Sequence, residues 1–484
     1  MTTDSSRPKV GIISTMTELY RPFPEMRPRM EKWETEMTAS MGEFADVIAP
    51  GICDTREMAD RAFEEIRRGG AELLIVFPLT YAESHIVLPA LRASPLPLLL
   101  LNSQILYDFD ADTSGRPFSD NQAPTGFFDL SNALVRTGIP FQVTSGYQGD
   151  LELMADLRDW CRVAHVAAQA RRFRVGLAGY SMDGMGDLAV DHTLLLGQGG
   201  AQVIHVPVSE IGSRAAAASA AEVQRLMEDD RRRFEVDPEL SPQEHEVSSR
   251  LEHALREIVK DRRLDAFTFH FTAVADDGRI RTLPVLGASK LLAEGIGYAG
   301  EGDVTCAALV AMMARLAGES EFFETWGMDF AGGAVMKNHM GEGNWRLARK
   351  DLPVKLLRAP IGLGDEVAPA VPSLVMKPGE ATLANLTTGR GGVLKLTVCE
   401  GAVPEMKPIH GVRTPHGKFT PGVPLKEFLE RFALAGASHH SALAYGRWGR
   451  SLRRLAWIMG WEFESIDAGA VPARSQPSVR RNSR

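Results

Sequence analysis

The chain of 484 residues is poor in cysteine and in aromatic residues, and it has no long apolar run. Its four cysteines, Cys53, Cys161, Cys306 and Cys399, lie far apart and form no C-x-x-C pair. This argues against a zinc knuckle and against a dense disulfide framework. No apolar stretch approaches the roughly 20 residues needed to cross a bilayer, and the N-terminus lacks a secretory pattern. We therefore expect a cytoplasmic protein without a membrane partner.

An excess of basic residues is also missing. Lys and Arg total 54 against 62 for Asp and Glu, so the formal net charge is -8. This balance gives no general attraction to nucleic acid or anionic lipid, and small molecules are the expected partners. Only residues 473–484, ARSQPSVRRNSR, are rich in Arg and Ser, and we expect them to form a flexible basic tail without a role.

What the chain does contain is typical of a globular protein: 44% hydrophobic and 24% charged residues. At roughly 150 residues per domain, the length suggests about three domains. In residues 1–170, apolar runs such as KVGIIS and ELLIVFPL alternate with amphipathic stretches, and a long helical pattern ends the segment. Such alternation indicates a parallel sheet covered by helices.

Two further domains are expected. Residues 171–325 repeat the strand pattern in RVGLAG, QVIHVPV and AFTFHFT, between helical stretches. In residues 326–484 the pattern changes to short extended pieces bounded by Gly, Pro and Asn, such as GGVLKLTVCEG. The predicted fold class is therefore α/β: two Rossmann-like layer domains followed by a β-rich, barrel-like C-terminal domain.

The loop GYSMDGMGD, at 179–187, follows a predicted strand and precedes the predicted helix LAVDHTLLL. Its position resembles that of a phosphate cradle, but its glycine spacing matches neither nucleotide-binding pattern and it contains no basic residue. A plain strand-to-helix turn with Asp187 near the helix start is the simpler interpretation. A nucleotide-dependent enzyme is the alternative, and we expect no nucleotide binding.

Several acids and imidazoles lie in turns or at strand ends. They are Glu301 and Asp303 in GYAGEGDVTC, Glu324 in EFFETWGMDF, His339 in KNHMGEGN, and His439 with His440 in LAGASHHSALAYG. Acids before an apolar helix either cap it or reach into a cleft, and a lone loop histidine is often only solvated. Together, two carboxylates and one or two neutral imidazoles suit Mn²⁺ or another divalent ion. Their separation in sequence is too long for a local metal motif.

These segments, in this order, resemble the L-arabinose isomerase family, with a weaker likeness to L-fucose isomerases. The resemblance rests on the GEGD turn, the H-M turn and the LAGASHH run, and it covers nearly the whole chain. It implies Mn²⁺ as the cofactor, or Co²⁺ or Mg²⁺ in its place, and a homo-oligomer that is hexameric or trimer-based. The implied metal ligands are Glu301, Glu324, His339 and His440.

The resemblance also implies sugar contacts, and some of them depart from the family pattern. The contacts that carry over are Met185, Thr268, Phe271 and His439. Thr17 in MTELY takes the place of a family glutamine, and Thr125 in NQAPTGFF that of a histidine which members lend across a subunit boundary. A site that loses a hydrogen-bond partner can discriminate strongly against its old substrate. We therefore expect an altered sugar pocket that includes Thr17 and Thr125.

The reaction that the resemblance implies is the interconversion of an aldose and a ketose, which moves a proton between C2 and C1. A divalent ion that binds O1 and O2 stabilises the cis-enediolate, so that one base can transfer the proton between C2 and C1 on a single face of it. We expect Glu301 and Glu324 to be the acid/base pair as well as ligands, and His439 to orient a hydroxyl. The alternative is a non-catalytic sugar- or polyol-binding protein on the same scaffold.

Overall fold

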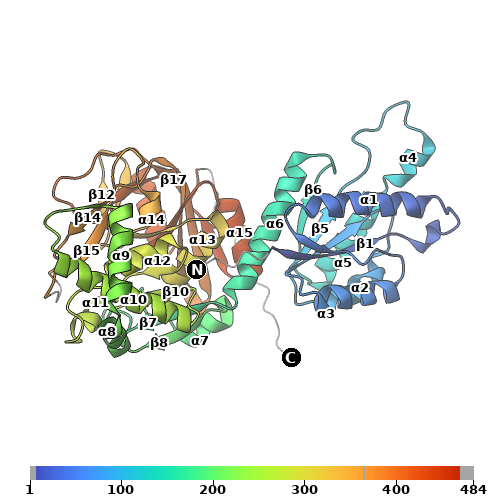
Figure 1. Ribbon diagram of the computed structural model, residues 1–484. Coiled ribbons are helices and arrows are strands. Elements are labelled where there is room, and N and C mark those ends of the chain that lie inside the picture. The colour runs from blue at the N-terminus through green and yellow to red at the C-terminus, as the bar shows by residue number, and fades with distance from the viewer. Residues whose placement is uncertain (1–6, 363–365, 469–484) are drawn as a thin grey trace. The chain divides into compact units, whose positions relative to one another are not determined.

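The computed structural model describes residues 7–362 and 366–468, so the predicted tail at 473–484 lies outside the described residues. The chain divides into two compact units, with the division between Ala168 and Gln169 (Figure 1). The boundary predicted near residue 325 falls inside the second unit, and the three-domain division stays a prediction. Among the described helices, none is both long and apolar enough to span a membrane.

The N-terminal unit is built on a parallel sheet with the strand order β2-β1-β4-β5-β6, and β3 pairs with the far end of β1. Its elements are β1 (Lys9–Thr15), α1 (Met26–Met41), β2 (Asp46–Ile48), β3 (Ile52–Cys53), α2 (Arg56–Arg68), β4 (Leu73–Pro78), α3 (Leu88–Ala93), β5 (Leu98–Asn102), α4 (Gly115–Asp120), α5 (Ala123–Thr137), β6 (Gln142–Ser145) and α6 (Leu151–Ala170). The residues of β4 are buried along the whole strand. Burial of this kind is typical of parallel strands that helices cover on both faces.

Helices cover both faces of this sheet (Figure 1). On one face, α2 presents Phe63 and Ile66 to the strands, and these residues belong to its buried stripe. Close packing there needs a glycine, because a Cβ at Gly11 of β1 would lie 2.1 Å from Cγ2 of Ile66. On the other face, Trp33 of α1 packs edge-on against Phe77 of β4, with ring centroids 4.9 Å apart. The predicted α/β layer is confirmed.

The second unit opens with another parallel sheet, ordered β11-β10-β7-β8. The strands and helices of this part of the chain are β7 (Arg174–Ala178), α7 (His192–Leu194), β8 (Gln202–Val206), α8 (Val208–Ala217), α9 (Ala220–Arg233), β9 (Glu235–Val236), α10 (Pro242–Asp261), β10 (Ala266–Phe269), α11 (Phe271–Ala275), α12 (Val285–Ala293), β11 (Gly297–Ala299) and α13 (Val304–Ala317). The predicted start of a helix directly after Asp187 is wrong. The chain is irregular until Asp191, whose side chain caps the short helix α7.

The remainder of the second unit contains a closed antiparallel barrel. The elements of this part of the chain are β12 (Glu321–Asp329), β13 (Ala334–Asn338), β14 (Lys355–Arg358), β15 (Ala370–Ser373), β16 (Gly379–Thr388), β17 (Leu394–Val403), β18 (Gly417–Pro421), α14 (Leu425–Leu434), β19 (His440–Tyr445), α15 (Gly449–Met459) and β20 (Glu462–Ser465). Of these, β14 and β15 lie outside the barrel and form a separate sheet with β9. The ring runs β16-β19-β12-β13-β18-β17, and β17 pairs again with β16. Phe323, Phe419 and Leu443 lie in its buried core. The predicted barrel-like, β-rich region is confirmed.

Helix α13 links the parallel sheet to the barrel. It contacts β10 and β11 of the sheet and β12, β16 and β19 of the barrel. A helix that has neighbours all around it must be apolar on every side, and this explains its sequence VTCAALVAMMARLA, which is buried almost throughout. The turn that precedes α13 is thereby held against the strands β12 and β19.

Candidate active site

Glu324 and His440 lie on neighbouring barrel strands. Glu324 of β12 is directly paired with His440 of β19, and on its other side it is paired with Asn338, the residue before His339. Directly paired residues of an antiparallel ladder place their side chains on the same face, about 5 Å apart at Cβ. The strand register therefore brings together two residues that are 116 positions apart in the sequence.

Glu301 lies in the turn between β11 and α13, in a strained backbone conformation. Its φ is +61°, in the left-handed region that residues other than glycine rarely adopt. Gly302 follows at φ +78°, and a Cβ there would lie only 2.3 Å from the carbonyl oxygen of Tyr180. Strain of this kind concentrates at functional positions. The turn places Oε2 of Glu301 at 3.5 Å from Nε2 of His439 and at 3.9 Å from Nε2 of His440.

The loop at 179–187 is part of this site. The backbone N–H of Met182 donates to the carbonyl of Glu301 at 2.9 Å, and the hydroxyl of Ser181 donates to the carbonyl of Gly302 at 2.9 Å. Asp187 does not begin a helix as predicted; its Oδ2 lies 2.6 Å from Nδ1 of His439. Met185 is half-buried in the same loop. The loop therefore supports the Glu301 turn and holds an imidazole.

Each of the three histidines of the site has a carboxylate at its Nδ1. The pairs are Asp187 with His439 at 2.6 Å, Asp303 with His440 at 3.1 Å, and Glu342 with His339 at 2.7 Å. In a neutral ring, such a carboxylate holds the proton on Nδ1 and leaves a lone pair on Nε2. None of these three carboxylates was predicted to hold a histidine. Glu342, three residues after His339, could have been found from its spacing, whereas the other two partners are too distant in sequence.

All four predicted ligands have a buried atom that forms no hydrogen bond with any residue the structure describes. These atoms are Oε2 of Glu301, Oε2 of Glu324, Nε2 of His339 and Nε2 of His440. Leaving a buried polar atom without a hydrogen bond costs about 1–3 kcal/mol, and only Oε2 of Glu301 is partly compensated, by Nε2 of His439 at 3.5 Å, so these four atoms indicate a ligand. Glu301, His439 and His440 offer ligand atoms within 4.8 Å of one another. The rings of His339 and His440 lie 6.1 Å apart. This set of oxygen and nitrogen donors fits a divalent cation.

The acids of the site change the protonation of its imidazoles. Burial opposes the charged form of His439, but Glu301 and Asp187 outweigh it and raise its pKa to about 9. Burial also opposes protonation of His339, and the carboxylate of Glu342 outweighs it, so the pKa of His339 is raised. Contact with His439 lowers the pKa of Glu301. The acids and imidazoles of the site therefore form a compact set of ion pairs.

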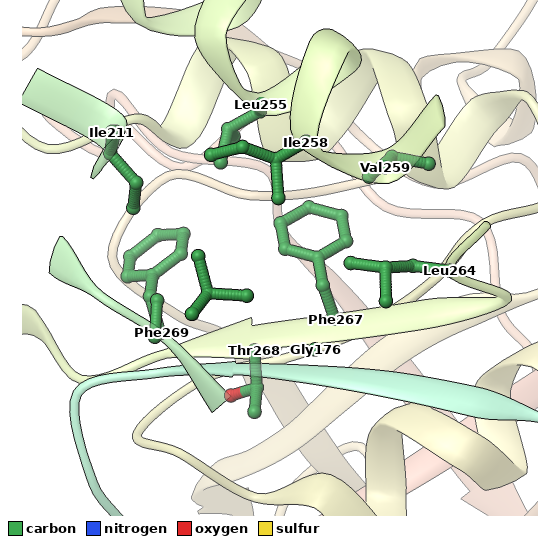
Figure 2. A pocket seen from close by; sticks show the side chains of 11 residues that line it. Gly176, Ile211, Leu255, Ile258, Val259, Leu264, Phe267, Thr268 and Phe269 are labelled. Carbon is green, nitrogen blue, oxygen red and sulfur yellow. The ribbon is translucent and has the colours of Figure 1, made fainter. Parts of the chain in front are cut away.

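Thr268 lies in β10 beside the site, and its hydroxyl donates to the carbonyl of Gly300 at 3.3 Å. Figure 2 shows Phe267 and Phe269 pointing into an apolar cavity against α10, whereas the hydroxyl of Thr268 points away from it. No titratable side chain lines this cavity, and we assign it to the hydrophobic core. Phe271 begins α11 and stacks on His270, with ring centroids 4.9 Å apart.

The two remaining predicted contacts, Thr17 and Thr125, lie in the N-terminal unit. Thr17 is buried; its hydroxyl donates to Oε1 of Glu83 at 2.9 Å and accepts from the N–H of Leu19 at 3.1 Å. Thr125 is exposed on α5. Because both belong to the other compact unit, their contacts with a sugar stay predictions.

Comparison with known proteins agrees with the resemblance read from the sequence. Residues 182–319 match the L-arabinose isomerase central domain, and residues 319–462 match the L-arabinose isomerase C-terminal domain. The L-arabinose isomerase of Mycolicibacterium smegmatis is 26% identical over 425 residues, which cover 84% of this chain and 83% of that protein. That of Acidothermus cellulolyticus is 26% identical over 407 residues, 81% of this chain and 80% of its own length. That of Aeromonas salmonicida is 27% identical over 409 residues, with coverage of 81% and 80%.

Proposed function

The chain belongs to the L-arabinose isomerase family, and on this basis we propose that it is a metal-dependent aldose–ketose isomerase with an altered sugar pocket. Its relatives support an isomerase. The observation that carries the metal dependence is the set of four buried atoms without a hydrogen bond on Glu301, Glu324, His339 and His440. Two carboxylates and two imidazoles are a donor set that suits a divalent cation.

These four side chains would hold a divalent cation, for which we propose Mn²⁺, with Co²⁺ or Mg²⁺ as substitutes. When bound, the cation supplies Lewis acidity toward the oxygens of the sugar. The carboxylates at Nδ1 of His339 and His440 keep each Nε2 directed toward the centre of the site. The chain thereby fixes the donor atoms before any substrate binds.

Glu301 and Glu324 are the proposed acid/base pair. One carboxylate takes the proton from C2 of the aldose and returns it to C1, along a cis-enediol route. The other carboxylate transfers the hydroxyl proton between O2 and O1. A positioned acid or base typically contributes about 10²- to 10⁴-fold to the rate. His439, held by Asp187 at 2.6 Å, orients a hydroxyl of the sugar beside Glu301.

The altered pocket concerns the end of the sugar away from C1 and C2. We propose that Met185, Thr268 and Phe271 form part of it, and that the protein is a homo-oligomer, hexameric or trimer-based. We also propose that Thr17 and Thr125 contact the sugar. Because Thr17 already donates to Glu83, it offers a different hydrogen-bonding pattern from the family glutamine.

A panel of aldopentoses, 6-deoxyhexoses and aldohexoses tests this function. The protein is first treated with a chelator and then assayed alone or with Mn²⁺, Co²⁺ or Mg²⁺. We expect ketose to form from at least one aldose, to disappear with the chelator and to return with Mn²⁺. Calorimetric binding of a sugar without ketose from any member of the panel would indicate a sugar- or polyol-binding protein instead. Turnover that survives complete metal removal would contradict the metal dependence.

A further inference from the structure

His270 lies where β10 ends and α11 begins, and the mechanism above does not use it. Only 4% of its surface is exposed, yet its Nε2 forms no hydrogen bond with the described residues. A buried polar group that has no partner is uncommon and costs about 1–3 kcal/mol, so it calls for an explanation.

The hydrogen bond at the other ring nitrogen, Nδ1, determines which tautomer His270 adopts. The backbone N–H of Ala273 donates to Nδ1 of His270 at 3.3 Å, which caps α11. A nitrogen that accepts a hydrogen bond carries no proton, so the neutral ring must carry its proton on Nε2. Burial keeps the ring neutral, because it lowers the pKa of His270. The unpaired atom is therefore an N–H donor.

Two aromatic rings hold His270 in place next to the site. Tyr180 stacks on the imidazole with ring centroids 4.6 Å apart, and Phe271 stacks on it at 4.9 Å. Tyr180 begins the loop that is hydrogen bonded to the Glu301 turn, and its carbonyl lies directly against Gly302. His270 is also at the carboxyl end of a parallel strand, where α/β sheets bind their ligands. It is thus a rigid donor beside the loop that supports the Glu301 turn.

We propose that Nε2–H of His270 donates a hydrogen bond to a hydroxyl oxygen of an open-chain sugar or polyol, on a carbon beyond C2, and so contributes to the choice of substrate. This inference rests on the proposed function for the position of the sugar. It adds a specificity-determining residue to Met185, Thr268 and Phe271. A neutral donor in a stacked ring selects by the position of a hydroxyl rather than by charge.

Two variants separate this role from a structural one. His270→Asn keeps an oxygen that can accept from the N–H of Ala273, but its shorter amide places no N–H at the position of Nε2, whereas His270→Gln supplies an amide N–H with longer reach. His205→Asn, an exposed histidine of β8, is the matched control. Calorimetry with Mn²⁺-loaded protein measures binding of arabinitol, ribitol and xylitol, which cannot be isomerised. The monodeoxy analogues of the best binder are then measured in the same way, and circular dichroism checks the fold of each variant.

We expect His270→Asn to weaken binding of the best pentitol about twofold to tenfold, and His270→Gln to restore part of this loss. One deoxy analogue should bind the wild type and His270→Asn equally, because it lacks the accepting hydroxyl. Unchanged affinity in His270→Asn, an equal loss for every analogue, or no pentitol binding by the wild type would overturn the inference. Wild-type binding without ketose formation, together with the expected variant effects, would reject the isomerase and keep the role of His270.

Discussion

Oε2 of Glu342 lies 2.7 Å from Nδ1 of His339, while Oε1 of the same carboxylate accepts from the hydroxyl of Tyr298 at 2.6 Å. The carboxylate is thus fixed from two sides, and it fixes the imidazole in turn. We expect Glu342→Gln to lower the affinity for Mn²⁺ about 10- to 100-fold, because the ring loses its orientation. Calorimetric titration of chelator-treated protein measures this. Glu405→Gln, at an exposed carboxylate, is the control, and equal affinities in the two variants would contradict the role.

Replacement of either proposed acid/base residue should abolish most of the turnover. Glu301→Gln and Glu324→Gln each keep the shape of the side chain but remove its ability to exchange a proton. We expect the aldose–ketose rate to fall at least about 10²-fold in each variant, measured with the best sugar of the panel and saturating Mn²⁺. Glu430→Gln, on the exposed face of α14, should leave the rate unchanged. Near wild-type rates in both site variants would reject the assignment.

Gly300 gives a test of geometry that leaves every ligand in place. A Cβ at this position would lie 2.5 Å from Nε2 of His339, and the backbone conformation there is open to other residues. Gly300→Ala should therefore displace the imidazole and weaken Mn²⁺ binding, with a loss of stability of about 1–3 kcal/mol from overpacking. Gly327→Ala in β12 meets no atom within 4 Å and serves as the control. Identical metal affinities would show that His339 tolerates the methyl group.

The charge state of His439 makes stability depend on pH in the metal-free protein. Its pKa is about 9 in the folded chain and 6.5 as an ordinary value, so the folded state holds the extra proton between these limits. The stabilisation from Asp187 and Glu301 is therefore complete below about pH 6.5 and is lost as the pH rises through 9. We expect the difference in unfolding free energy between wild type and His439→Gln to shrink over this window. Urea titrations of chelator-treated protein at several pH values measure it; a difference that grows with pH would contradict the ion pairs.

A buried ion network supports the second unit away from the site. Nζ of Lys290 lies 2.7 Å from Oδ1 of Asp230 and 2.7 Å from Oε2 of Glu252, and all three side chains are buried. Lys290→Met leaves Asp230 with His245 at 2.9 Å and Glu252 with Arg256 at 2.7 Å but removes the ammonium group between the two buried carboxylates, so we expect a loss of about 3–5 kcal/mol in unfolding free energy. Urea unfolding measures this loss, with Lys260→Met, an exposed lysine of α10, as the control. A loss below 1 kcal/mol would mean that the network relaxes around the substitution.

The sequence was sufficient for elements that have a strong local pattern. The run KVGIIS became β1 (Lys9–Thr15), and the stretch KEFLERFALAG became α14 (Leu425–Leu434). Both depend on the periodicity of apolar residues, which needs no tertiary information. The helix predicted from LAVDHTLLL begins later than expected, because the loop before it is hydrogen bonded to the distant Glu301 turn and Asp191 provides the N-cap. The pairing that closes the barrel between β16 and β17 likewise has no local signal.

The four proposed ligands could be named from the sequence, but the hydrogen-bond partners of the histidines could not. Glu301, Glu324, His339 and His440 could be proposed because each lies in a short run that resembles the family. Their convergence depends on the strand register of the barrel and on α13, and the sequence carries no direct sign of either. Asp303 illustrates the limit: it was expected to cap α13 or to reach into a cleft. Its Oδ1 does cap the helix, while its Oδ2 binds His440, so one carboxylate has both roles.

The strands that carry Glu324 and His440 have bonded neighbours on both sides in the closed ring. A single insertion or deletion within β12 or β19 would turn every later side chain to the opposite face of the wall. The loops that present Tyr180 and His270 have no such restriction. New sugar preferences in this lineage should therefore evolve through loops that change in length and composition, while the two ligand-bearing strands keep an invariant length.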